Sequence, residues 1–188
     1  MTGEDARARR EALAEAIREA SRAGRLSGRE ELGAELAARS LPLPEGAGAA
    51  ELDALLAGAL AENGDLASVE SASGESLYHA PPLLSRTYAA ILARKGSPVL
   101  LVAGEVRTSS AEYPRPVPVE LFEQPPFELS PEEIGEALKA MATSPDYSDI
   151  TYTTTTGGSV WLFSTRHLER RYAAFLAQRA EEEALEGG

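Results

Sequence analysis

The chain contains two histidines, His79 and His167, and no cysteine. Imidazole is the side chain most suited to act as a base or a metal ligand near neutral pH. Neither histidine has a second histidine or an acid three or four positions further on, as a helical metal site would need. The sequence also lacks a nucleophile-elbow motif, a phosphate-binding loop and a dinucleotide fingerprint. We expect surface or helix-capping imidazoles, no metal or cofactor, and no enzymatic activity. The alternative is an enzyme that uses one of the two histidines.

The charge and composition of the chain restrict the kinds of partner that it can bind. In 188 residues there are 30 acidic and 18 basic side chains, a net charge of −12, which repels nucleic acid at long range. The absence of cysteine excludes disulfides and cysteine-bound iron–sulfur clusters. Hydrophobic residues make up 43%, enough for a packed core, and no run of about 20 apolar residues predicts a membrane helix. These properties predict a cytoplasmic protein that does not enter a membrane.

The first half of the chain shows three helical segments followed by a hairpin. Apolar residues recur at helical spacing over 6–23, again around Leu32 and Leu36, and over 49–62. Ser27 stands three residues before Glu30 and predicts a capping box at the start of the second helix. A hairpin is predicted over 66–80, with Ser73-Gly74 at its tip. Three helices and a two-stranded wing are the order of a winged-helix domain, which by itself does not determine function.

The second half repeats the end of the first. Residues 65–95 align without a gap on 149–179, an offset of 84 residues, and the best-matching stretch places Tyr88 on Tyr172. A duplication explains this alignment better than chance. Both tyrosines lie on apolar helix faces, so we expect them to pack in the core with the hydroxyl at the surface.

The second unit is predicted as follows. The Tyr88 helix doubles as its first helix, and Pro98-Val-Leu-Leu-Val-Ala predicts a buried strand over 97–106. The later segments are a short helix over 120–124, a helix capped by Ser130, a hairpin over 149–164 and a closing helix over 168–183. The predicted fold class is therefore α+β, two tandem winged-helix-like units at 1–96 and 97–188, with a proline-rich connector at 113–131 and a C-terminal helix.

Nucleic-acid binding is disfavoured by the predicted third helices. A winged helix places basic or amide side chains of that helix against base edges. The segment 51–62 has no basic residue, and 131–141 has only Lys139. The basic candidate is the first helix, with Arg7, Arg9, Arg10 and Arg18. Glutamates interleave with these arginines, which favours a solvated face. A DNA-binding transcriptional regulator that uses this helix is the alternative function.

The segment from Tyr113 to Phe127 is rich in proline, which holds a chain extended. One interpretation is a rigid connector between the two units. The other is a partner-binding ridge anchored by Tyr113, Arg115, Phe122 and Phe127, since aromatic residues and arginine dominate such contacts. The acidic run at 181–183 predicts a solvated tail, with a docking peptide for a basic partner as the alternative.

The order and charge of the two units resemble tandem winged-helix interaction proteins such as bacterial segregation and condensation protein B. In addition, Tyr113-Pro-Arg-Pro-Val-Pro, Asp149-Ile and His167-Leu resemble uncharacterised bacterial proteins encoded beside redox enzyme systems. These resemblances imply an accessory or assembly subunit. The predicted function is a non-catalytic adaptor that binds a protein partner or a second copy of itself.

Overall fold

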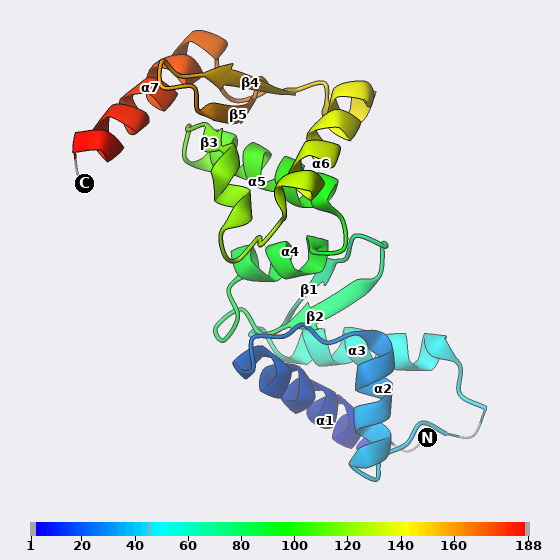
Figure 1. Ribbon diagram of the computed structural model, residues 1–188. Helices are drawn as coiled ribbons and strands as arrows, with labels where there is room; N and C mark the ends of the chain where they lie inside the picture. Colours follow the sequence, from blue (N-terminus) through cyan, green and yellow to red (C-terminus); the bar gives the residue numbers. More distant parts are fainter. Residues whose placement is uncertain (1–2, 45, 187–188) are drawn as a thin grey trace. The chain divides into compact units, whose positions relative to one another are not determined.

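The computed structural model describes residues 3–44 and 46–186. The fold is α+β: this part of the chain contains seven α-helices and two small antiparallel sheets. The chain forms two compact units, Met1–Arg94 and Lys95–Gly188. Figure 1 shows the order of the elements within each unit. No helix among the described residues combines the length and the apolar character needed to cross a membrane.

Three helices build the core of unit 1: α1 (Gly3–Arg22), α2 (Arg29–Ala38) and α3 (Ala49–Glu62). Their apolar faces meet in one cluster, as predicted from helical spacing. The fully buried side chains include Leu13, Ile17, Leu32, Leu36 and Leu56. Burial of these side chains stabilises the unit by about 1.5–3 kcal/mol each before the entropy cost of ordering.

The predicted cap at Ser27 is wrong. Gly28 occupies the N-cap of α2 and makes no side-chain cap. Ser27 is buried and pairs with Tyr78 through two backbone hydrogen bonds of 3.0 and 2.9 Å. Tyr78 lies in β2 (Ser76–His79), which pairs with β1 (Ala67–Glu70) around Gly74, whose φ is +84°. Ser27 therefore forms a one-residue bridge to the open edge of this two-stranded sheet, in the position of a third strand. Helix α4 (Arg86–Arg94) follows β2 in the chain.

The predicted strand over 97–106 is a helix, α5 (Pro98–Glu112). Ser97 Oγ accepts from the amide of Leu100, and Pro98 occupies the first turn, where its missing N–H costs nothing. A short apolar run does not distinguish a buried strand from a buried helix. The buried positions of α5, among them Val102 and Val106, repeat at helical spacing. Helix α5 is thus the first helix of unit 2. The Tyr88 helix, α4, belongs to unit 1 alone, so the prediction that α4 serves both units is wrong.

The rest of unit 2 follows the predicted order. It consists of β3 (Val117–Pro118), the 3₁₀ helix η1 (Val119–Glu123), α6 (Pro131–Thr143), the 3₁₀ helix η2 (Pro145–Tyr147), β4 (Ile150–Thr154), β5 (Val160–Ser164) and α7 (Arg170–Glu186). Ser130 and Glu133 form the full capping box of α6. The sheet has the order β3-β5-β4, with Gly158 (φ +93°) in the turn of the predicted hairpin.

The two units repeat the same contacts. In unit 1 the amide of Ala80 donates to Ser21 Oγ at 2.9 Å, and in unit 2 the amide of Ser164 donates to Ser110 Oγ at 3.0 Å. The third strand is repeated as well, because Val117 pairs with Leu162 as Ser27 pairs with Tyr78. The repeat therefore includes the first helix of each unit and the position of the third strand. The sequence alignment covered neither of them.

The predicted core positions of Tyr88 and Tyr172 are wrong. Tyr88 is 37% exposed and Tyr172 is 48% exposed. The buried faces of α4 and α7 consist of alanines instead: Ala89, Ala93, Ala173 and Ala177. The small side chains let each helix approach its hairpin closely, and the preceding tyrosine is turned to the outside.

Candidate functional site: an apolar groove in unit 2

A groove of about 490 Å³ lies in unit 2 between the extended segment 115–118 and helix α7. Its lining is mostly apolar. The main contributors are Pro116, Pro118, Leu121, Trp161 and Leu176. Cavities of this size and character are typical of sites that bind a small molecule or the side chains of a peptide.

Strand β3 forms one wall of the groove and is an edge of the sheet. Its single ladder partner is β5, through Val117–Leu162 and Pro118–Trp161. Pro116 and Pro118 carry no backbone N–H, so this edge offers few donors to an added strand. This edge is therefore poorly suited to pairing with an added strand.

Trp161 supplies an unused hydrogen-bond donor. It is the only tryptophan of the chain, lies in β5 and lines the groove. Its Nε1 is buried and has no acceptor among the described residues. A buried N–H without a partner costs about 1–3 kcal/mol.

Two arginines lie on the rim. Arg115 is exposed and its guanidinium carbon is 5.3 Å from the centre of the Tyr113 ring. In the described part of the chain it has no carboxylate partner. Arg179 pairs with Glu183 at 2.7 Å, and this hydrogen bond raises the pKa of Arg179. The rim therefore carries two cations and one anion, in a chain whose net charge is −12.

The structure separates the four residues predicted as a partner-binding ridge. Tyr113 is 60% exposed and Arg115 lies on the groove rim. Phe122 and Phe127 are buried and pack edge to face with ring centres 5.2 Å apart, so they are core residues and offer no contact surface. The proline-rich segment runs from α5 to α6 inside unit 2, so it does not connect the two units.

The two histidines lie in different units, His79 in unit 1 and His167 in unit 2. His79 is buried, with Nδ1 3.0 Å from the carbonyl oxygen of Leu84, which corrects the predicted surface position. The aligned residue of unit 2 is the core residue Phe163. His167 is exposed, and its backbone amide donates to the carbonyl of Ser164. Among the described residues no group of three or more histidines and acids could hold a metal ion.

A buried ion pair lies between α5 and the start of β4. Asp149 accepts from Arg107 Nε at 3.0 Å and Nη2 at 2.5 Å, and from Ser164 Oγ at 2.7 Å. These donors, Arg107 first, hold the pKa of Asp149 well below its usual range. Unit 1 repeats the pair, since Arg18 binds Asp65 at 2.8 and 2.9 Å. The repetition indicates a structural role rather than a catalytic one.

The acidic run at the end of the chain is not only a solvated tail. The Glu181 carboxylate accepts from Thr155 Oγ1 and Ser159 Oγ, both at 2.7 Å, and from the amide of Gly157 at 3.1 Å. These bonds lower the pKa of Glu181. Glu181 therefore ties α7 to the tip of the hairpin, which the sequence did not predict.

The arginines of the first helix are engaged within unit 1. Arg7 pairs with Glu11 and Arg10 with Glu62, each at 2.9 Å. Arg9 donates to the carbonyl of Pro42 at 2.8 Å, and Arg18 binds Asp65. The exposed faces of α3 and α6 carry no compensating cations apart from Lys139; their exposed side chains include Ala54, Ala57, Ala61, Glu132 and Glu136.

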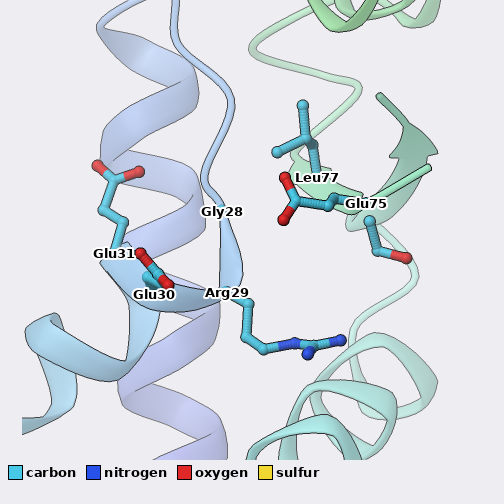
Figure 2. Close-up of a pocket in the computed structure, with 7 residues that line it drawn as sticks. Gly28, Arg29, Glu30, Glu31, Glu75 and Leu77 are labelled. Atoms are coloured by element: carbon cyan, nitrogen blue, oxygen red, sulfur yellow. The ribbon is translucent and has the colours of Figure 1, made fainter. Parts of the chain in front are cut away.

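The corresponding corner of unit 1 contains an acidic hollow of about 450 Å³. Figure 2 shows Glu75 and Leu77 of the hairpin facing the start of α2, which carries Arg29, Glu30 and Glu31, so three carboxylates and one guanidinium line the hollow. Leu77 aligns with Trp161, and Gly28 precedes α2 as Pro118 precedes η1. The same place in the repeat is thus acidic in unit 1 and apolar with a cationic rim in unit 2.

Comparison with known proteins shows similarity to one family. Residues 96–185, which include the groove, match the model of the YdhW C-terminal domain. The chain is 31% identical over 162 residues to the uncharacterised protein YdhW of Escherichia coli (strain K12), an alignment that covers 84% of this chain and 71% of the relative. No solved structure gives a significant match. The chain therefore belongs to the YdhW family.

Proposed function

We propose that the protein is a non-catalytic adaptor built from two winged-helix-like units, and that the groove of unit 2 binds a segment of a protein partner. The winged-helix assignment is supported by the repeated order of helix, edge strand, two helices, hairpin and closing helix, in which η1 stands for the second helix of unit 2. The partner-binding role is supported by the groove, an apolar hollow of about 490 Å³.

The chemistry of the groove indicates what the partner segment contains. The floor, which includes Trp161, is apolar, and the rim adds Arg115 and Arg179. An apolar side chain next to a carboxylate satisfies both features. The partner segment is therefore apolar and acidic.

The observation that carries the proposal is the position of Arg115, a cation without a carboxylate partner among the described residues, beside the apolar floor of the groove. Most of the other arginines bind carboxylate or carbonyl groups. The resemblance to proteins encoded beside redox enzyme systems makes an oxidoreductase complex the first candidate partner. In such a complex the protein is an accessory or assembly subunit.

Site-specific photo-crosslinking from the groove tests the proposal. A benzophenone amino acid replaces Leu121 in the full chain, and the control carries it at Lys139 on the exposed face of α6. We expect a defined protein to be crosslinked from position 121 but not from 139. The purified partner then binds wild type and Arg86→Glu equally, and Arg115→Glu at least about tenfold more weakly. Equal binding of Arg115→Glu, or crosslinking only from position 139, contradicts the proposal.

A further inference from the structure

We infer that Gln178 and Glu181 are positioning residues of the groove in unit 2, because they hold the part of α7 that forms one of its walls. This α7 wall consists of the groove-lining residues of the helix, Leu176, Arg179, Ala180 and Glu183. The effect of Gln178 and Glu181 on ligand binding rests on the proposed function, whereas their effect on the shape of the groove does not.

The second half of α7 has no buried side chain to anchor it. The buried side chains of the helix are Ala173 and Ala177. Every described side chain after Ala177 is half-buried or exposed, and three of the four wall residues belong to this part. Few buried apolar contacts mean that a segment can open locally at low cost, so apolar packing alone does not fix the wall.

Polar contacts with the tip of the second hairpin, residues 155–159, supply the missing anchor. Glu181 accepts three hydrogen bonds from this tip, two from hydroxyl groups and one from a backbone amide. One turn earlier, Gln178 Oε1 accepts from the backbone amide of Thr156 at 2.9 Å and from its hydroxyl at 3.1 Å. The tip therefore holds α7 within the same two turns that carry the wall.

The anchoring residues and the wall lie on different sides of α7. The wall residues follow the spacing i, i+3, i+4 and i+7 from Leu176 to Glu183, which places them on one face of the helix. Gln178 and Glu181 are three residues apart and fall on another side, directed to the hairpin. They therefore act on a ligand in the groove by holding the helix, without contacting the ligand.

Unit 1 has an equivalent tie to its hairpin but no helical wall. The amide of Ala72, which aligns with Thr156, donates to the carbonyl oxygen of Ala93 at 3.0 Å. This carbonyl is free to accept because α4 ends one residue later. In the longer α7 the aligned carbonyl lies inside the helix, and the Gln178 side chain accepts in its place. Among the described residues none of α4 lines the hollow of unit 1, so the longer helix, its side-chain tie and the wall occur together.

Acrylamide quenching of Trp161 in the free full chain tests the shape of the groove, since Trp161 and the α7 wall line the same cavity. We expect Glu181→Ala to raise the quenching constant at least about twofold, because the wall opens more often. Glu181→Gln should give a smaller increase, since Oε1 alone accepts both hydroxyl bonds and glutamine keeps that oxygen. The matched control Glu186→Ala removes an exposed carboxylate of the same helix and should leave the constant unchanged.

Equal quenching constants in Glu181→Ala and Glu186→Ala overturn the inference. Circular dichroism shows whether each variant keeps the helix content of wild type. Ser159→Ala removes one of the same hydrogen bonds from the hairpin side and should also raise the constant. This variant decides the test if Glu181→Ala does not fold.

Titration with anilinonaphthalene sulfonate, an apolar anion, tests the effect on binding. A site that is formed only part of the time binds more weakly in proportion. We therefore expect at least about threefold weaker binding in Glu181→Ala than in Glu186→Ala, although both variants remove one negative charge. Weaker binding in Arg115→Glu together with equal binding in the two alanine variants overturns the inference and leaves the proposed function standing. If wild type does not bind the dye, the proposed function fails, and the quenching of Trp161 decides whether the tie positions the wall.

Discussion

At the residue scale, the repeated arginine–aspartate pairs show how one contact can differ in strength between two copies of a fold. The Asp149 side chain is 5% exposed and has three side-chain donors, one of them Ser164. The Asp65 side chain is 38% exposed, and its side-chain donor among the described residues is Arg18. Water screens the hydrogen bonds of the buried Asp149 carboxylate less than those of Asp65, so loss of the Asp149 carboxylate is the more costly, although Arg107 itself is 31% exposed.

Replacing each aspartate by asparagine should therefore give unequal losses. We expect Asp149→Asn to lower the free energy of unfolding by about 2–4 kcal/mol. Asp65→Asn should cost about 1 kcal/mol or less, because water screens an exposed pair. Urea unfolding followed by circular dichroism measures both free energies of unfolding. The variant in one unit serves as the control for the variant in the other unit. Equal losses would show that burial does not set the strength of the pair.

The same carboxylates predict how stability depends on pH. The pKa values of Asp65 and Asp149 are lowered in the folded protein, chiefly by hydrogen bonds from Arg18 and Arg107. A carboxylate with a lowered folded-state pKa stabilises the fold above its unfolded pKa of about 4, and this stabilisation is lost as the pH falls further. The free energy of unfolding should therefore decrease as the pH falls below about 4. The decrease should be smaller in Asp149→Asn; an unchanged pH profile would contradict the assignment.

At the element scale, the second hairpin depends on a helix that comes after it in the chain. Glu181 binds Thr155, Ser159 and the Gly157 amide, and a Cβ at Gly157 would lie 2.7 Å from the Glu181 carboxylate. The missing side chain at Gly157 is what allows this approach. The tip of the hairpin and the middle of α7 thus form one structural element.

Removing the Glu181 carboxylate should loosen the tip without unfolding the unit. We expect Glu181→Ala to speed hydrogen exchange of the Gly157 amide, which loses its acceptor. Glu182→Ala removes a neighbouring carboxylate whose described contact is with Gln178, and serves as the control. Exchange by NMR that is equal in both variants would contradict the role of Glu181.

The elements themselves were largely predictable from the sequence, with one clear exception. Helical spacing and turn residues identified α1, α3, both hairpins and the Ser130 cap, because these signals are local. The run after Ser97 was predicted as a strand, since a short buried apolar segment satisfies either structure. The contacts of Ser27 and Glu181 were not predictable, because each is made with a residue far away in the sequence.

At the scale of the whole molecule, the distribution of cations argues against a nucleic-acid interface. The arginines of α1 bind glutamate, aspartate or carbonyl groups, and α3 carries no basic residue. A gel-shift titration with random double-stranded DNA at low salt should therefore show no complex that weakens as salt is added. A salt-sensitive complex that is lost on reversing Arg7 would favour the regulator instead.

The groove itself was only partly visible in the sequence. Arg115 was singled out because it stands among prolines, but Phe122 and Phe127 were predicted to join it and are core residues. Trp161 and Leu176 come from segments far from Arg115 in the chain, and only the fold brings them together. The alignment of Leu77 with Trp161 was the available signal, because it marked a position where the two repeats differ.

Trp161 makes the occupancy of the groove directly measurable, since no other tryptophan contributes to the fluorescence of the chain. Anilinonaphthalene sulfonate, an apolar anion, matches the chemistry expected of the partner segment. We expect saturable energy transfer from Trp161 to the dye in wild type and in Arg86→Glu, with about tenfold weaker binding in Arg115→Glu. Absence of saturable transfer, or an affinity unchanged by Arg115→Glu, would contradict a groove that binds apolar, acidic ligands.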